Sequence, residues 1–181
     1  APILKNGNQI EGDFQLKKFG SSGFLKNVKF NPDLIIYDKN YQNDQSFSPR
    51  FKIHLSDTYK LIKTKFTNGS KLVEVGCGKG TFLDLVKKDN YFKYEGFDNT
   101  YEGDDPLIHS RYLTSEDRIY ADIVVLRHTL EHIQAPHKFL EMLNIIFGNN
   151  AIIFIEVPQF DWIDRNKVIF DLSYEHVNYF N

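Results

Sequence analysis

The stretch from residue 71 to residue 80 constrains the fold most, because a short apolar run leads straight into closely spaced glycines. The run Leu-Val-Glu-Val at 72–75 has the length and composition of a buried strand, and Gly76, Gly78 and Gly80 follow it. Glycine has no Cβ, so it permits a tight turn and lets a ligand approach the bare backbone. The stretch therefore predicts an α/β fold with a binding loop at the end of a strand.

Strand and helix patterns alternate along the chain beyond this loop. Apolar residues recur at helical spacing in 81–88 and in about 136–147, where Gly148 marks the end of the second helix. We expect strands at 72–75, 94–97, within 107–113, at 123–126 and at 151–155. This series predicts an open, Rossmann-like doubly wound α/β sheet with right-handed crossovers.

The chain before the loop has a different character, and we place a domain boundary at its end. Residues 1–68 are expected to form an N-terminal extension, with a short hairpin around Gly20 to Phe30. A helical pattern runs from Pro49 to Phe66 with Ser48 as its cap, and this helix is expected to lie on the main sheet. Residues 69–181 are expected to form the ligand-binding domain.

Composition excludes several classes of protein. The 22 Lys and Arg are spread among 24 Asp and Glu, for a formal charge of −2, so we expect no nucleic acid partner. The single cysteine, Cys77, excludes an internal disulfide framework. We find no secretory leader pattern and no apolar stretch near the ~20 residues of a membrane span. We therefore expect a cytoplasmic protein.

The glycine spacing indicates which ligand the loop binds. A dinucleotide-binding loop has its third glycine where this chain has Thr81, and a Walker-type loop needs Ser or Thr where Gly80 follows Lys79. Asp98 ends the next strand, 22 residues after Gly76, where a carboxylate can accept hydrogen bonds from both hydroxyls of a ribose. The pattern predicts an adenosine-containing cofactor.

At these residues the chain resembles class I S-adenosylmethionine-dependent methyltransferases. The resemblance implies S-adenosyl-L-methionine as cofactor and S-adenosyl-L-homocysteine as product, with Asp98 holding the ribose. It also implies a lid before the first strand. The implied cofactor-binding residues are Glu74, Gly76, Cys77, Gly78, Gly80, Asp98, Asn99, Arg127 and His128, with Ser115 near the adenine and Tyr41, Gln45 and Phe47 in the lid. A role for Cys77 as nucleophile is not expected, because such loops need small side chains.

Residues 41–48 and 174–180 look like the bacterial branch that methylates sugars and other glycan components. Relatives in that branch carry a zinc module with CxxC pairs, but residues 19–23 contain no cysteine. Ser173 stands where carbon-methylating relatives favour tyrosine. We therefore expect an oxygen acceptor, on a sugar or on a phosphate-like group of a capsule or surface glycan.

The catalytic residues expected for this transfer lie near the end of the chain. His176 is the expected general base, because a histidine near its ordinary pKa can take a proton from an acceptor hydroxyl. Glu175 and Tyr174 flank it, and His128 lies after the fourth strand. His128 and His132 also match the HxxEH zinc pattern, but no third ligand is identifiable, so we expect no metal.

Two other functions remain open. The family's sheet normally has seven strands, whereas we find about five, so the chain can be a truncated cofactor-binding protein without catalysis. The alternative is an NAD-dependent dinucleotide enzyme. An open sheet edge beside the strand at 151–155 also suggests a homo-oligomer.

Overall fold

The computed structural model describes residues 4–5, 8–9, 11–20, 23–35, 45 and 47–181. The chain forms two compact units. The sheet unit comprises Tyr37–Arg127 and Lys138–Ile155, and the terminal unit comprises Ala1–Ile36, His128–His137 and Glu156–Asn181. The boundary that we expect between residues 68 and 69 stays a prediction.

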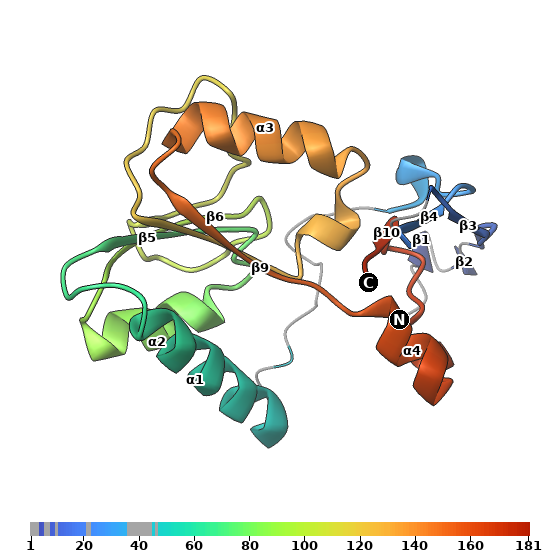
Figure 1. Ribbon diagram of the computed structural model, residues 1–181, viewed down its shortest axis with the longest axis horizontal. Coiled ribbons are helices and arrows are strands. Elements are labelled where there is room, and N and C mark those ends of the chain that lie inside the picture. Colours follow the sequence, from blue (N-terminus) through green and yellow to red (C-terminus); the bar gives the residue numbers. More distant parts are fainter. Residues whose placement is uncertain (1–3, 6–7, 10, 21–22, 36–44, 46) are drawn as a thin grey trace. The chain divides into compact units, whose positions relative to one another are not determined.

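A five-stranded sheet forms the centre of the sheet unit (Figure 1), with its strands in the order β7-β6-β5-β8-β9. The strands are β5 (Lys71–Val75), β6 (Lys93–Phe97), β7 (Ile108–His109), β8 (Ile123–Arg127) and β9 (Ile152–Glu156). β5 pairs in parallel with both β6 and β8, and β6 pairs in parallel with β7. Each expected strand is present within one or two residues, and the expected doubly wound fold is confirmed.

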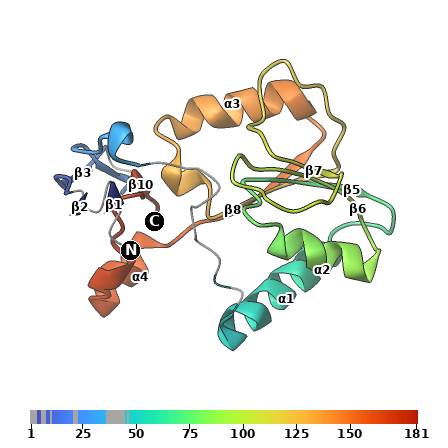
Figure 2. The ribbon, with the colours of Figure 1, turned by 180° about the vertical axis from the view of Figure 1, so that it is seen from behind.

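Helices cover both faces of this sheet (Figure 2): α1 (Pro49–Lys63) and α2 (Thr81–Asp89) lie on one face, and α3 (Pro136–Phe147) on the other. Successive residues of a strand point to opposite faces. Leu72 of β5 accordingly packs in the core under α1 and α2, whereas Val73 packs in the core under α3, and both are 0% exposed. The inner strands β5 and β8 are buried on both sides, which explains why they read as apolar runs.

Local capping sets the ends of the helices. The Ser48 hydroxyl accepts a hydrogen bond from the Phe51 amide at 3.4 Å, with Pro49 at the first helical position, as expected. α1 ends at Lys63, so Phe66 lies beyond the helix and packs against the core from a turn instead. α2 begins after Gly80, which has a φ of 84° and ends the glycine loop in the left-handed conformation.

The terminal unit contains an antiparallel three-stranded sheet in the order β10-β4-β3. Its strands are β3 (Leu16–Lys18), β4 (Leu25–Asn27) and β10 (Asn178–Tyr179). The hairpin expected around Gly20 to Phe30 is present as β3 and β4, but its first strand begins earlier, at Leu16. β10 was not expected, and it brings residues near the end of the chain onto β4.

The remaining elements of the described chain are short. They are β1 (Leu4–Lys5), β2 (Asn8–Gln9), η1 (Pro32–Leu34), η2 (Leu130–His132), α4 (Phe160–Asn166) and η3 (Ile169–Asp171). Of these, η2 matters most for function, because it carries the residues of the HxxEH pattern after β8. No helix in the described part of the chain has the length and apolar character needed to cross a membrane.

Candidate functional site

The glycine loop leaves β5 and turns into α2 through three residues of positive φ: Gly76 at 79°, Gly78 at 55° and Gly80 at 84°. Side chains with a Cβ are strained in this region, so the conformation depends on glycine. A Cβ built on Gly80 would lie 3.1 Å from Ile108 Cδ1, whereas one on Gly78 would meet no atom within 4 Å. The loop therefore needs Gly80 for packing, and at Gly78 it presents bare peptide to open space.

Asp98 lies against this bare peptide. Its Oδ2 atom accepts a hydrogen bond from the Gly78 amide at 2.7 Å. Its Oδ1 atom accepts from the amide and the hydroxyl of Thr100, each at 2.7 Å. A carboxylate has about four lone-pair sites, so these three bonds leave acceptor capacity toward a ligand. The structure thus brings together the two halves of the expected nucleoside site.

Lys79 is held within the loop by its own contacts. Its Nζ atom donates to the Thr100 carbonyl at 2.8 Å and lies 3.2 Å from Glu102 Oε2. These contacts link the glycine loop to the segment that follows β6. The ammonium group is thus engaged with protein oxygens, in contrast to the phosphate-binding lysine of a Walker-type loop.

Three expected site residues are buried beside the loop. Glu74 lies in the middle strand β5, and Arg127 is the last residue of the neighbouring β8, where its guanidinium lies 5.0 Å from the Phe82 ring centroid. Burial, with the nearby charges of Glu74 and Asp98, raises the pKa of the Cys77 thiol far above its ordinary value. The thiol is therefore protonated and inert at neutral pH, in line with its expected structural role.

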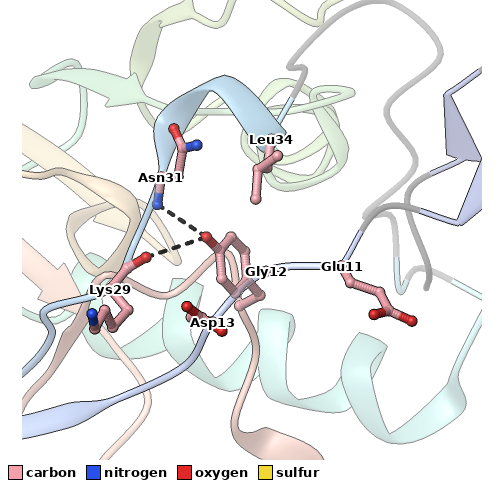
Figure 3. Close-up of a pocket in the computed structure, with 7 residues that line it drawn as sticks. Glu11, Gly12, Asp13, Lys29, Asn31 and Leu34 are labelled. Carbon is pink, nitrogen blue, oxygen red and sulfur yellow. Dashed lines mark hydrogen bonds between the residues drawn. The ribbon is translucent and has the colours of Figure 1, made fainter.

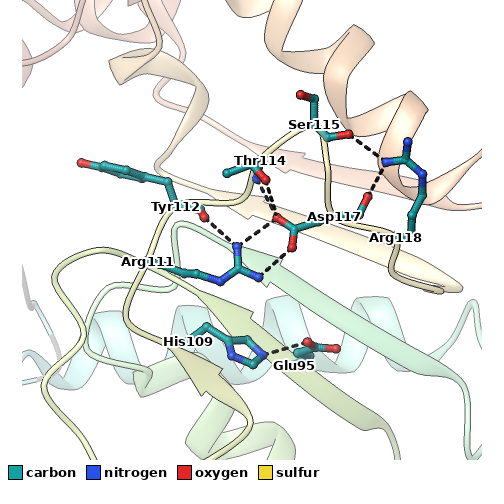
Figure 4. Close-up of polar contacts among 8 residues, drawn as sticks. All are labelled: Glu95, His109, Arg111, Tyr112, Thr114, Ser115, Asp117 and Arg118. Carbon is teal, nitrogen blue, oxygen red and sulfur yellow. Dashed lines mark hydrogen bonds and ion pairs between the residues drawn. The ribbon is translucent and has the colours of Figure 1, made fainter.

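Ser115, the residue expected near the adenine, lies in a tightly bonded turn after β7 (Figure 4). Arg111 binds both carboxylate oxygens of Asp117, at 2.9 and 2.7 Å, and the Thr114 amide donates to the same carboxylate at 2.8 Å. These hydrogen bonds hold the pKa of Asp117 well below its usual range. The Ser115 carbonyl accepts from Arg118 at 2.8 Å.

The ring of Phe97, the last residue of β6, contacts a histidine of β7. His109 stacks on it with centroids 4.6 Å apart, and the His109 Nε2 atom lies 2.8 Å from Glu95 Oε1 (Figure 4).

The expected lid is described only in part. Tyr41 lies outside the described residues. The Gln45 carbonyl accepts from the Ser48 amide at 2.9 Å, directly before α1, and the Phe47 side chain is 82% exposed. Closure of this segment over a cofactor stays a prediction, as does a cofactor contact of Asn99.

A second group of polar residues belongs to the terminal unit. His128 has a φ of 50°, and its ring lies between two carboxylates: Nδ1 is 3.4 Å from Glu131 Oε1, and Nε2 is 3.2 Å from Glu156 Oε1. Burial opposes a charge on this ring, but the two neighbouring carboxylates outweigh it and raise the pKa of His128 to about 9. His128 is thus a cation at neutral pH.

His176 has the opposite electrostatic character. Burial, together with the charges of His132 and His128, lowers its pKa to about 4. Its ring lies 5.0 Å from the ring of His132, centroid to centroid, and its Nδ1 atom has no hydrogen-bond partner among the described residues. His176 is therefore a neutral, half-buried imidazole. The expectation that its pKa lies near the ordinary value is wrong, because burial penalises the charged ring. Its neutral nitrogen can still accept a hydrogen bond or bind a metal ion.

Tyr174 and Glu175 are not arranged around His176 as their order in the chain suggested. The Tyr174 hydroxyl donates to the Lys29 carbonyl at 3.5 Å and accepts from the Asn31 amide at 3.0 Å. It lines a separate pocket of about 470 Å³ in the terminal unit (Figure 3), together with Glu11, Gly12, Asp13, Lys29, Asn31 and Leu34. Glu175 uses its backbone carbonyl, which lies 3.1 Å from His132 Nδ1.

Sequence reasoning missed two residues of these sites. Thr100 gives Asp98 two of its three hydrogen bonds, and its signal was its position two residues after the carboxylate, as in an Asx turn. Glu131, which is 1% exposed, lies between His128 and the pair His132 and His176. Its signal is the HxxEH pattern, which predicts ligands within one helix, whereas the structure adds His176 from a distant segment.

Comparison with known proteins assigns the chain to a family. A family model described as a methyltransferase domain matches residues 49–181. No curated protein matches the chain. The matched residues include the glycine loop, Asp98, the β8 segment and the whole polar group of the terminal unit.

Solved structures show the same fold. The plantazolicin methyltransferase BpumL, in complex with a pentazolic desmethylPZN analog and SAH, is 18% identical with a TM-score of 0.50, over 71% of this chain and 55% of BpumL. A second match is a Haloferax volcanii complex of the Trm112 methyltransferase activator with a candidate methyltransferase. It has 14% sequence identity and a TM-score of 0.56, and it covers 81% of this chain and 72% of the matched chain. The chain thus spans about half the length of BpumL.

Proposed function

The chain belongs to the methyltransferase family whose model matches residues 49–181, and we propose that it transfers a methyl group from S-adenosylmethionine to an oxygen of a small acceptor. One observation carries the proposal: Asp98 and the bare peptide at Gly78 are in direct contact, at 2.7 Å. The ribose hydroxyls of a nucleoside bound there would donate to the Asp98 carboxylate, and the nucleoside would pack against the bare backbone of the loop.

The cofactor assignment favours S-adenosylmethionine over NAD for two reasons. The family is that of methyltransferases, and the loop has Thr81 where a pyrophosphate-binding loop has its third glycine. Lys79, which a triphosphate site would use, is bound to Thr100 and Glu102 instead. In this proposal Glu74 and Arg127 line the buried end of the site, and Asn99 and Ser115 lie toward the adenine.

The acceptor is proposed to be a sugar or a phosphate-like group of a capsule or surface glycan. The likeness of residues 174–180 to glycan methyltransferases supports this, and Ser173 favours oxygen over carbon. The lone, buried Cys77 suits a reducing compartment, so we propose that the reaction takes place in the cytoplasm.

Methyl transfer itself makes limited demands on the protein. The cofactor's sulfonium makes its methyl group electrophilic, so an acceptor oxygen held in line at about 3 Å can attack it. The carbon–sulfur bond breaks, S-adenosylhomocysteine leaves, and the acceptor loses its proton. His176 is proposed to take that proton, with support from its buried Nδ1 atom, which has no partner in the described chain. His128 supplies a positive charge in the same group, and Glu175 and Tyr174 position the segment.

Cofactor binding is the first test. Isothermal titration of S-adenosylhomocysteine, NAD and ATP into the protein should show micromolar affinity for the first ligand alone. Asp98→Ala should weaken that binding by at least 50-fold, because the ribose hydroxyls lose their acceptor. Asp104→Ala removes an exposed carboxylate from the same region and should leave the affinity unchanged. Binding of NAD without S-adenosylhomocysteine would overturn the assignment.

Turnover is the second test. A methyl-release assay over sugar and sugar-phosphate acceptors should show S-adenosylhomocysteine formation that depends on one of them. Tight cofactor binding without methyl release from any acceptor would contradict the proposed catalysis and favour a cofactor-binding role.

A further inference from the structure

The terminal unit contains a group of metal-binding side chains for which methyl transfer gives no full account. Glu131, His132 and His176 each offer one ligand atom, and these atoms all lie within 4.8 Å of one another. From them we infer that the terminal unit binds a divalent first-row transition-metal ion of the zinc type through two imidazoles and one carboxylate. This donor set, with a position left open, is that of many catalytic zinc sites.

The carboxylate gives the first reason. Glu131 is 1% exposed, and its Oε2 atom has no hydrogen-bond partner within the described ranges. Its Oε1 atom lies 3.4 Å from His128 Nδ1, so an imidazole faces one side of the carboxylate and Oε2 lies on the other. A buried carboxylate oxygen without a partner is costly, and a cation at Oε2 would remove that cost.

The histidines give the second reason, because their nitrogens are prepared for a metal ion. His132 Nδ1 lies 3.1 Å from the Glu175 carbonyl, which can only accept, so Nδ1 carries the proton and Nε2 keeps its lone pair. Metal-binding histidines are typically oriented by such a bond from their other ring nitrogen. His176 is half-buried, and its buried Nδ1 atom is without a partner in the described chain.

The backbone that carries the three ligands is cross-bonded. The Val177 amide donates to the Glu131 carbonyl at 2.8 Å. Because Val177 directly follows His176, this bond ties the backbone at His176 to the backbone at Glu131. The Asn178 side chain donates to the carbonyls of Leu130 and Ile133, at 3.2 and 2.6 Å. η2 and the segment before β10 are therefore held together independently of a metal ion.

The spacing needs only a small contraction. A tetrahedral centre with ligand bonds of about 2.1 Å places its donor atoms about 3.4 Å apart. The present separations are at most 4.8 Å. Side-chain rotations that move the ligand atoms of Glu131 and His176 by about an ångström would bring them to the tetrahedral spacing. Two nitrogen donors favour zinc or cobalt over magnesium, which prefers oxygen ligands.

The site does not depend on the proposed methyl transfer, because its test is binding. A metal ion bound to His176 would occupy the nitrogen that the proposed proton transfer needs, so the two roles are tested in separate preparations. The role of His176 as base is measured after EDTA treatment, and metal binding is measured without cofactor. Failure of one proposal therefore leaves the other testable.

The experiment titrates Zn²⁺, Co²⁺ and Mg²⁺ into untagged protein that has been stripped with EDTA. We expect one Zn²⁺ per chain with a dissociation constant below 10 µM, a tetrahedral Co²⁺ absorption spectrum, and Mg²⁺ binding at least 100-fold weaker. Glu131→Gln and His176→Gln should each weaken Zn²⁺ binding by at least 30-fold. His109→Gln, which removes a histidine that pairs with Glu95, should leave it unchanged.

Several results would overturn the inference: Zn²⁺ binding weaker than 100 µM, unchanged affinity in both site variants, or tighter binding of Mg²⁺. Circular dichroism shows whether each variant folds. If the site variants do not fold, zinc X-ray absorption of the wild-type protein decides. Two coordinated imidazoles support the site, and none or one overturns it.

Discussion

The glycine loop with Asp98 and the histidine–carboxylate group of the terminal unit are built in different ways. The first site comes from two neighbouring parallel strands, β5 and β6, and each half directly follows its strand. The second joins η2 to a segment more than 40 residues later in the chain, through β10 and side-chain bonds to the backbone. A site made at strand ends follows from the order of elements, whereas the second depends on a long-range contact.

The largest expected effect separates the two sites by activity. His176→Gln should lower the turnover number by at least 100-fold, because it removes the proposed proton acceptor and metal ligand. The affinity for S-adenosylhomocysteine should stay within twofold of wild type, as measured by titration calorimetry. Equal loss of both properties would mean that the two sites are not functionally distinct.

Next in size is a test of how the second site is assembled. Asn178→Ala should lower the free energy of unfolding by about 3 kcal/mol, because two carbonyls lose the donor that a 1%-exposed side chain supplies. Urea unfolding measures this change. Asn150→Ala, at an exposed turn, should have almost no effect. A cost below 1 kcal/mol for Asn178→Ala would show that β10 does not hold this site together.

The first site is tested at the bare peptide. Gly78→Ala should weaken S-adenosylhomocysteine binding by about 100-fold, because the added methyl group occupies the open space over the loop. Gly69→Ala is the matched control, since Gly69 also has positive φ, 87°, and nothing within 4 Å. Both should lose about 1 kcal/mol of stability. An unchanged affinity in Gly78→Ala would place the cofactor elsewhere.

The smallest expected effect concerns the turn that carries Ser115. The pKa of Asp117 is lowered in the folded chain, so its contribution to stability is present above its unfolded pKa of about 4 and is lost as the pH falls below it. Asp117→Asn should therefore cost about 1 kcal/mol at pH 7, and the difference should shrink steadily as the pH falls from about 4 to about 2. Thermal melts from pH 2 to pH 7 measure this, with Glu116→Gln as a neutral control. A cost independent of pH would contradict the charge pairing.

Much of the sheet unit could be predicted from the sequence, because its signals are local. The apolar run at 123–126 identifies a buried parallel strand, Ser48 and Pro49 mark a helix start, and Gly76 to Gly80 require a turn. The terminal unit was harder to predict. β10 has two residues and pairs with β4 across about 150 positions, a contact for which no local pattern exists.

The candidate sites divide along the same line. Asp98 could be assigned to the glycine loop in advance, since the carboxyl ends of adjacent parallel strands meet at one edge of the sheet. Tyr174 and His176 are two residues apart, yet one lines a pocket with Asn31 and the other lies beside Glu131 and His132. Spacing in an irregular segment does not indicate which way each side chain faces.

The amino-acid sequence by itself determined the α/β frame, the conformation of the glycine loop and the kind of ligand that the loop accepts. These properties depend on steric limits and hydrogen bonds within a few residues. Only the tertiary structure decided that Glu131 would be buried between His128 and His176, and what charge each ring carries. The reason is that burial and charge are sums over neighbours from the whole fold, and those neighbours are brought together only when distant segments pair.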